Sequence, residues 1–404
     1  MKLYAQHGFQ AGEKLKLGFS RGLIDGVVFS PRDISPENLK TQLAELRKQS
    51  PEADLLFDPQ YYACFFINSE NARLGHLTEY EQYFKTRRRN QLEREKQISE
   101  DLKASFDFQM DLGVSGIIAP NVHIPRSFNS IEAGISKNFI RLAGDVYKTY
   151  KTKKPLYATL SISRNALTDK QELKSFLNDI TLLDNPPDGF YVLIAAQNSE
   201  ARFDIYNADV IAAWMLINYS LKLNGFKVIN GYSDILTPFL GIAGAIAGST
   251  GWWSNLRTFS LDRFNPLSSG GKLPNQRYLS KKLLNRIYYY ELDSLKNARI
   301  SEVLNGLPSD EYYDNDGSTP ERNVEVIQAW DAIKSLNSEM VGKNIIQNLQ
   351  NCNQLIDNAS DLYLSIPSVT GLQLEAKSNK ENLEPLKEGV KLFAELAEID
   401  LPKN

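Results

Sequence analysis

Cysteine and histidine are scarce in this chain of 404 residues, which holds two cysteines and three histidines. The two cysteines, Cys64 and Cys352, lie far apart in the sequence. This argues against a disulfide framework and excludes a cysteine-rich zinc site. Metal hydrolases built on barrels need clustered histidine and carboxylate ligands. We therefore expect neither a metal nor a cofactor.

Long apolar runs and a strong net charge are also missing. The longest apolar stretch, residues 235–246, is broken by Pro238 and by glycines, so no segment is expected to span a bilayer. Residues 1–19 contain no apolar signal core. A formal charge of −3 and a pI near 5.8 give no overall attraction to nucleic acid. The sequence thus predicts a soluble cytoplasmic protein that makes no membrane contact.

Short, continuous apolar runs alternate with helical patterns from residue 25 to about residue 263. Strands buried on both faces of a parallel sheet have this character. We expect strands at residues 25–31, 54–59, 114–121, 155–163, 188–197, 226–231 and 244–249, and a weaker one at 256–261. Seven or eight βα units in series favour an α/β fold of the (β/α)₈ TIM-barrel type over an open doubly wound sheet.

The predicted barrel occupies residues 1–264. Residues 2–19 are expected to form an N-terminal hairpin that plugs the base of the barrel, and a basic insertion breaks the alternation near residues 67–97. Residues 265–278 are rich in proline, glycine and serine, which is typical of a loop or linker. Helical patterns follow, so residues 277–404 are expected to form a helical C-terminal extension.

Two acids, Asp58 and Asp234, follow predicted strands. Chemistry in a barrel lies at the C-terminal ends of its strands, so these acids are the candidate catalytic residues. Glycosidases act with two carboxylates across the sugar, but the sequence does not give the distance between this pair. No glutamate stands at the predicted strand ends, which counts against that class. A strand-end aspartate can also cap a turn, so a structural role for Asp58 stays open.

Most of the other strand ends carry neutral polar or aromatic side chains, which suit recognition of a ligand by hydrogen bonds and stacking. The candidate substrate-binding residues are Gln60, Tyr61, Asn121, His123, Ser161, Ser163, Gln197, Asn230, Ser249, Thr250, Trp252 and Arg257. A hydrogen-bonded loop histidine is the alternative for His123. Because Trp252 and Trp253 are adjacent, one of the two is expected to pack rather than to bind.

Four stretches of the chain share their order of features with one known family. They are LLFDPQYYACFF (55–66), SEDLKASFDFQMDLGVSGIIAPN (99–121), NPPDGFYVLIAAQ (185–197) and FKVINGYSDILTPFLGIAGAIAGSTGWWSNLR (226–257). Together they resemble the tRNA-guanine transglycosylase family of base-exchanging barrels, over roughly residues 27–257. The resemblance implies that Asp58 matches the catalytic carboxylate that follows the family's second strand.

The chain departs from that family at several functional positions. The family's third-strand aspartate falls on Asn121, its base-reading glutamine on Ser161 or Ser163, and its nucleophilic aspartate near residues 248–249, and the cysteine-rich zinc site is missing. Covalent base exchange needs a carboxylate nucleophile and an acid–base partner, and only Asp58 remains. The resemblance therefore implies a divergent or inactive relative, or one that uses other residues.

Two basic segments could contact nucleic-acid phosphates. The candidate residues are Arg87, Arg88, Arg89, Lys281, Lys282 and Arg286. For the first segment the alternatives are a solvated helix face or an interface with an acidic partner. In the second, the cations alternate with tyrosines, which suits nucleic acid but at helical spacing is also typical of packing.

These patterns favour one function and leave a second open. The first is a transglycosylase-like barrel that binds a nucleobase or nucleoside, within RNA or DNA, and carries out base exchange or modification. The second is a non-catalytic barrel that serves as a binding or scaffold subunit, with a protein partner bound through its C-terminal helices. An enzyme acting on an unrelated small molecule is a third interpretation.

Overall fold

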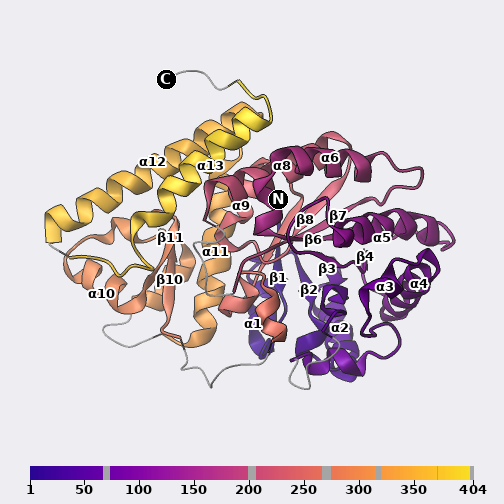
Figure 1. Cartoon of the computed structure of the whole chain (residues 1–404). Coiled ribbons are helices and arrows are strands. Elements are labelled where there is room, and N and C mark those ends of the chain that lie inside the picture. The colour runs from indigo at the N-terminus through magenta and orange to yellow at the C-terminus, as the bar shows by residue number, and fades with distance from the viewer. Residues whose placement is uncertain (67–72, 199–205, 266–273, 315–319, 371, 401–404) are drawn as a thin grey trace.

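Eight strand positions form a parallel barrel in the computed structural model, which describes residues 1–66, 73–198, 206–265, 274–314, 320–370 and 372–400 (Figure 1). The strands are β1 (Lys2–Gln6), β2 (Gly26–Phe29), β3 (Asp54–Phe57), β4 (Ile117–Ala119), β5 (His123–Ile124), β6 (Leu156–Ser163), β7 (Gly189–Ala195), β8 (Lys227–Asn230) and β9 (Ala247–Thr250). β4 and β5 pair in succession with β6 and share one position in the barrel. The predicted α/β TIM-barrel fold is confirmed.

β1 closes the barrel, so the predicted N-terminal hairpin is wrong. It pairs in parallel with β2 and with β9, and Tyr4 lies opposite both Gly26 and Ser249. On the other side of the barrel, the Ser115 N–H donates to the Leu55 carbonyl at 2.8 Å and joins β4 to β3. Every residue of β1 after the first is buried, as in a strand covered on both faces. Helix α1 (Gly12–Ser20) follows and completes a βα unit.

Residues 256–261, predicted as a weak eighth strand, form no strand. A 3₁₀ turn at Ser254–Leu256 begins this segment. Phe259 is buried, and its ring contacts Tyr62, which follows β3, and Tyr232, which follows β8. The segment therefore crosses the C-terminal mouth of the barrel. Because β1 already pairs with β9, no strand edge is open to it there.

Helices surround the barrel as the alternating pattern predicts. They are α2 (Pro36–Gln49), α3 (Arg89–Leu92), α4 (Glu95–Leu112), α5 (Ile131–Tyr147), α6 (Lys170–Thr181), α8 (Ala208–Leu223) and α9 (Thr237–Ile242). The side chains of Ser35, Ser130, Asp169 and Asn207 accept backbone N–H groups in the first turns of α2, α5, α6 and α8. These caps satisfy donors that the helix itself leaves unpaired. Within the described ranges, no helix combines the length and apolar character needed to cross a membrane.

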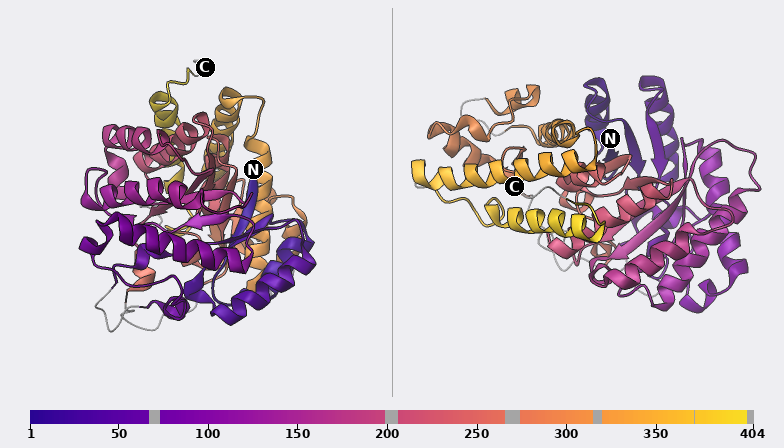
Figure 2. Two further views of the ribbon diagram at one scale, coloured as in Figure 1. Left: turned by 90° about the vertical axis from the view of Figure 1, so that its right-hand side faces the viewer. Right: turned by 90° about the horizontal axis from the view of Figure 1, so that it is seen from above.

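The C-terminal part of the chain begins with a hairpin, which corrects the predicted helical start at residue 277. β10 (Arg277–Ser280) and β11 (Asn285–Tyr288) pair antiparallel. They are followed by α10 (Tyr289–Asn297), α11 (Arg322–Met340), α12 (Ile345–Thr370) and α13 (Leu383–Leu396). α11 contacts α1 and α9, in the position of the helix of the eighth βα unit, while α12 and α13 pack side by side and α13 contacts α8 (Figures 1 and 2).

Candidate functional site

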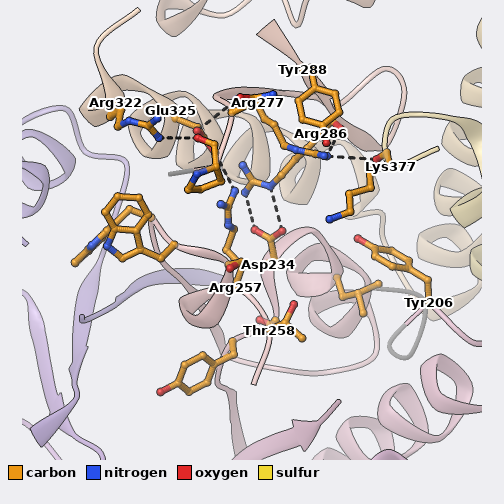
Figure 3. A pocket seen from close by; sticks show the side chains of 18 residues that line it. Tyr206, Asp234, Arg257, Thr258, Arg277, Arg286, Tyr288, Arg322, Glu325 and Lys377 are labelled. Carbon is orange, nitrogen blue, oxygen red and sulfur yellow. Dashed lines mark hydrogen bonds and ion pairs between the residues drawn. The ribbon is translucent and has the colours of Figure 1, made fainter. Parts of the chain in front are cut away.

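A cavity of about 260 Å³ lies between the C-terminal ends of β8 and β9 and the hairpin β10–β11 (Figure 3). The segments after β8 and β9 form one side of it. The hairpin, the start of α11 and the segment before α13 form the other. Its charged lining residues are Asp234, Arg257, Arg277, Arg286, Arg322, Glu325 and Lys377. Five cations against two acids give the wall a formal excess of three positive charges.

Asp234 joins the barrel to the hairpin through Arg286. Its carboxylate accepts hydrogen bonds from Nη2 of Arg286 at 2.7 Å and from Nε at 3.2 Å, and the Thr250 hydroxyl donates to it at 2.9 Å. Burial would raise the pKa of Asp234, but the Arg286 guanidinium, together with Arg257 and the Thr250 hydroxyl, outweighs burial and holds this pKa below its ordinary value. Asp234 is therefore an ionised anchor for Arg286 and a poor proton acceptor near neutral pH.

A second ion pair joins the segment after β9 to helix α11. Nη1 of Arg257 lies 3.0 Å from the Glu325 carboxylate, whose other oxygen accepts the backbone N–H of Arg277 at 3.3 Å. The side chains of Arg257 and Glu325 are each 14% exposed. Burial, followed by the nearby Arg286, lowers the pKa of Arg257. Such pairs are costly to remove from water, and the Arg257–Glu325 and Arg286–Asp234 pairs each hold one cation at the cavity.

Arg277, Arg322 and Lys377 supply the remaining positive charge. The Arg277 guanidinium lies 4.0 Å from the centre of the Tyr288 ring and donates to a backbone carbonyl of the hairpin at 3.1 Å. Arg322 donates to the backbone carbonyl of residue 274 at 2.9 Å. Figure 3 shows Lys377 extending into the cavity from the segment before α13. Contacts with carbonyl groups and with a ring orient the Arg277 and Arg322 side chains.

Backbone strain occurs at the same strand end. Tyr232 and Asp234, just after β8, have φ angles of 55° and 38°. Residues with side chains rarely adopt this region, which costs about 1–3 kcal/mol each. Both side chains are held from other segments, because the Tyr232 hydroxyl accepts from Arg263 at 2.9 Å and Asp234 is held by Arg286. Strain of this kind concentrates at binding and catalytic sites.

Asp58 is enclosed in the mouth of the barrel and does not line the cavity. It has no exposed surface and accepts hydrogen bonds from the Gln60 N–H and the Tyr62 hydroxyl, each at 2.9 Å. Burial raises the pKa of Asp58 to about 6. The candidate catalytic pair is thus divided between two environments, with Asp58 buried near the barrel axis and Asp234 ion-paired at the cavity.

A buried polar cluster surrounds Asp58. Arg263 lies in the segment that crosses the mouth, and it donates to Asp33 at 2.5 Å and to the Tyr232 hydroxyl at 2.9 Å. Three buried atoms of this region, Nε2 of Gln6, Nδ1 of His7 and Nε of Arg263, lack a hydrogen-bond partner among the described residues. Unsatisfied buried polar atoms are rare in folded proteins and call for an explanation.

Asn121 and Asn230 point to the outer helices, which corrects the expectation that they read a ligand edge. Nδ2 of Asn121 donates to the Ser136 hydroxyl in α5 at 2.9 Å. Oδ1 of Asn230 accepts the indole N–H of Trp214 in α8 at 2.6 Å. Successive side chains of a strand face opposite sides of the sheet, and these two amides lie on the outer side and attach helices to the barrel.

The other predicted ligand residues are dispersed. Nδ1 of His123 lies 2.9 Å from the Ser161 hydroxyl, and burial lowers the pKa of His123 to about 4, so this ring is neutral at pH 7. Ser249 donates to Gln6 at 2.7 Å inside the barrel. The rest lie elsewhere: Gln60 donates to Ser30, Tyr61 donates to the Asp101 carboxylate, Ser163 caps a 3₁₀ turn, and Gln197 is exposed.

The first predicted basic segment is divided between ion pairs and solvent. Arg87 donates to Asp101 through Nε at 3.0 Å and Nη2 at 2.6 Å. Arg89 pairs with Glu132 at 3.1 Å, and Arg88 is exposed. These three arginines therefore do not present one continuous cationic surface. Residues 67–72 of the predicted insertion lie outside the described residues.

The second basic segment is a hairpin rather than a helix, so its cations separate. Lys281 is buried and pairs with Glu339 at 2.5 Å, whereas Lys282 is exposed. Arg286 lines the cavity. The sequence had predicted it as a contact for nucleic acid.

Four predicted site residues line the cavity, namely Asp234, Trp252, Arg257 and Arg286. The sequence did not indicate the following lining residues: Tyr206, Arg277, Tyr288, Arg322, Glu325 and Lys377. They come from separate segments, so no local spacing indicated them. Among the described residues, no group of three or more histidine, cysteine, aspartate or glutamate side chains is placed to hold a metal ion.

Comparisons with known proteins assign no family. No family model matches the chain, and neither does any curated protein sequence. Dihydrodipicolinate synthase from Oceanobacillus iheyensis is 10% identical, with a TM-score of 0.33 over 96% of this chain and 95% of that chain. An O-GlcNAc hydrolase variant from Thermobaculum terrenum is 9% identical, with a TM-score of 0.36 over 98% of this chain and 95% of that chain. These likenesses are distant, and the resemblance to the transglycosylase family stays a prediction.

Proposed function

We propose that this barrel binds a small molecule through a phosphate group held in the cavity after β8 and β9. The observation that carries the proposal is the excess of three positive charges on the wall of a cavity of about 260 Å³. Arginine guanidinium groups match phosphate oxygens in pairs and are only weakly hydrated. A carboxylate would need fewer cations. The charge therefore favours a ligand group with two or more negative charges.

The location supports the same proposal. Counting β4 and β5 as one position, β8 and β9 are the seventh and eighth strands of the barrel. TIM barrels frequently bind phosphate at the loops that follow these two strands. The strained Tyr232 and Asp234 lie on the first of these loops. Fixed ion pairs also orient the cations before any ligand arrives, which lowers the ordering cost of binding.

Base exchange at Asp58 is a second candidate function, favoured by the raised pKa of about 6 for this carboxyl, which suits general acid–base catalysis. In this structure Asp58 has no exposed surface. A substrate would reach it only if the segment that carries Phe259 and Arg263 moved. The geometry therefore favours the cavity as the place where a ligand first binds, and the scaffold interpretation does not account for its clustered cations.

Calorimetric titration with inorganic phosphate and pyrophosphate tests the proposal. Arg322 and Lys377 are the best positions to change, because both side chains line the cavity from exposed positions. We expect Arg322→Gln and Lys377→Gln each to weaken pyrophosphate binding by about 10-fold, the order of one charged hydrogen bond. The matched controls Lys343→Gln and Lys380→Gln, at exposed positions outside the cavity lining, should bind as the unchanged chain does. Absence of binding at millimolar pyrophosphate, or equal affinity in all four variants, would contradict the proposal.

A further inference from the structure

We infer that the phosphate-bearing ligand also carries a flat ring, and that Trp253 stacks on that ring, an inference that rests on the proposed phosphate site. Trp252 and Trp253 both line the cavity, on the segment directly after β9. They face the cavity from the barrel, whereas most of the cations come from the hairpin, from α11 and from the segment before α13. Trp252 is only 6% exposed, whereas Trp253 is partly exposed and is the one available to a ligand.

One backbone carbonyl holds both indoles. Nε1 of Trp252 and Nε1 of Trp253 donate to the carbonyl oxygen of Phe9, at 2.8 Å and 3.4 Å. The Lys14 ammonium also lies 5.5 Å from the centre of the Trp252 ring. Because both indole N–H groups are already used, Trp253 offers a ligand its face and its carbon edges. Such a surface suits a flat ring, whereas sugar hydroxyls need polar partners.

The loop that supplies this carbonyl packs closely on the tryptophan segment. A side chain at Gly8 would overlap Leu256, and a Cβ at Gly251 would lie 2.6 Å from the Gln6 carbonyl oxygen. The Gly251 N–H also donates to the Leu256 carbonyl at 3.0 Å. Tight packing fixes the indoles before a ligand binds, so little ordering cost remains to be met on stacking.

The size of the cavity fits a ligand larger than phosphate. A volume of about 260 Å³ lies near the lower end of the range of roughly 300–1,000 Å³ that is common for small-molecule pockets, and a phosphate ion has only five heavy atoms. A phosphate among the arginines and a ring against Trp253 define one ligand class, the phosphate esters of flat heteroaromatic molecules, of which nucleoside monophosphates are common examples.

Titrations with three ligands measure the contributions of the ring and of the phosphate group to binding separately. The unchanged chain is titrated with adenosine monophosphate, ribose 5-phosphate and pyrophosphate, by calorimetry and by tryptophan fluorescence. Stacking predicts that adenosine monophosphate binds roughly 5- to 150-fold more tightly than ribose 5-phosphate and that it alone quenches the fluorescence. Trp214 and Trp330 are at most 1% exposed, so quenching would report on the cavity pair.

Variants of Trp253 test its role directly. We expect Trp253→Leu to remove the advantage of adenosine monophosphate while the affinity for ribose 5-phosphate is unchanged, and Trp253→Phe to keep part of the advantage. Equal affinities of the two organic phosphates in the unchanged chain would overturn the inference and leave the phosphate site standing. If neither these ligands nor pyrophosphate binds, the phosphate site itself is refuted. The comparison of the ligands uses the unchanged chain alone. It therefore tests the inference even if a Trp253 variant folds poorly.

Discussion

Asp234, on the segment after β8, accepts two hydrogen bonds from Arg286 on the hairpin, 52 residues further along the chain. The two contacts, at 2.7 and 3.2 Å, fasten the C-terminal part of the chain to the barrel mouth. They also place a guanidinium group on the wall of the cavity. One ion pair thus serves both the assembly of the fold and the charge of the site.

Replacing either partner of this pair should destabilise the fold, and the two losses should not add when both partners are replaced. The Asp234 and Arg286 side chains are 19% and 6% exposed, so a lone partner would remain largely buried. We expect Asp234→Asn and Arg286→Met each to lower the free energy of unfolding by about 3 kcal/mol. The double variant should lose less than the sum, by about 1–3 kcal/mol. Urea unfolding of the four proteins at pH 7 measures these terms, and strictly additive losses would show that the two side chains are not coupled.

Asp58 should make stability depend on pH in an unusual direction for an aspartate. Burial raises its pKa from 3.8 to about 6, so the folded chain holds this proton more tightly than the unfolded chain does. The stabilising contribution of the protonated carboxyl is full below pH 4 and is lost as the pH rises through 6. Relative to the unchanged chain, the free energy of unfolding of Asp58→Asn should therefore rise by about 2–3 kcal/mol between pH 4 and pH 7.

Urea unfolding at several pH values checks the Asp58 prediction, because contributions from other acids cancel in the difference between the two proteins. Glu100→Gln, at an exposed position, is the control for the replacement of an acid by its amide. A flat difference for Asp58→Asn would mean that the carboxyl titrates alike in the folded and unfolded chains.

Arg87 should matter for stability and Arg88 should not. The Arg87 and Asp101 side chains are 13% and 6% exposed, and Tyr61 donates to the same carboxylate. Arg87→Ala would leave Asp101 buried without its cation, so we expect a loss of about 2–4 kcal/mol. Arg88→Ala, at an exposed position, should change the free energy of unfolding by less than about 0.5 kcal/mol. Similar values for the two variants would argue against the ion pair.

Two glycines of helix α5 should respond to alanine in opposite directions. A Cβ at Gly134 meets no atom within 4 Å, so Gly134→Ala should stabilise the protein by about 0.5–1 kcal/mol, since alanine favours a helix. A Cβ at Gly144 would overlap the carbonyl oxygen of Asn185. Gly144→Ala should therefore destabilise by about 1–3 kcal/mol despite the same helix preference. Thermal unfolding compares the two, and stabilisation of both would disprove the close approach at Gly144.

The barrel could be predicted because its evidence is local. Apolar runs such as residues 189–195, followed by helical patterns such as residues 208–223, recur along the chain and match β7 and α8. β1 escaped prediction because it is short and is followed by polar residues, which read as a hairpin. The hairpin at residues 277–288 was predicted as a helix because lysine, leucine and tyrosine fit either structure. The antiparallel pairing, from Arg277 opposite Tyr288 to Ser280 opposite Asn285, shows that the segment is a hairpin.

The sequence by itself determined the parallel barrel, because burial on two faces requires continuous apolar strands and the covering helices show their own period. It also named Asp58 and Asp234 as strand-end acids. Only the tertiary structure decided that Asp58 is sealed beneath the segment containing Phe259 and that Asp234 is bound to Arg286. Periodicity depends on residues two to four positions apart, whereas an ion pair across 52 residues depends on the path of the whole chain. The charged lining of the cavity also depends on the path of the whole chain, because its charges come together only when the C-terminal part packs on the barrel.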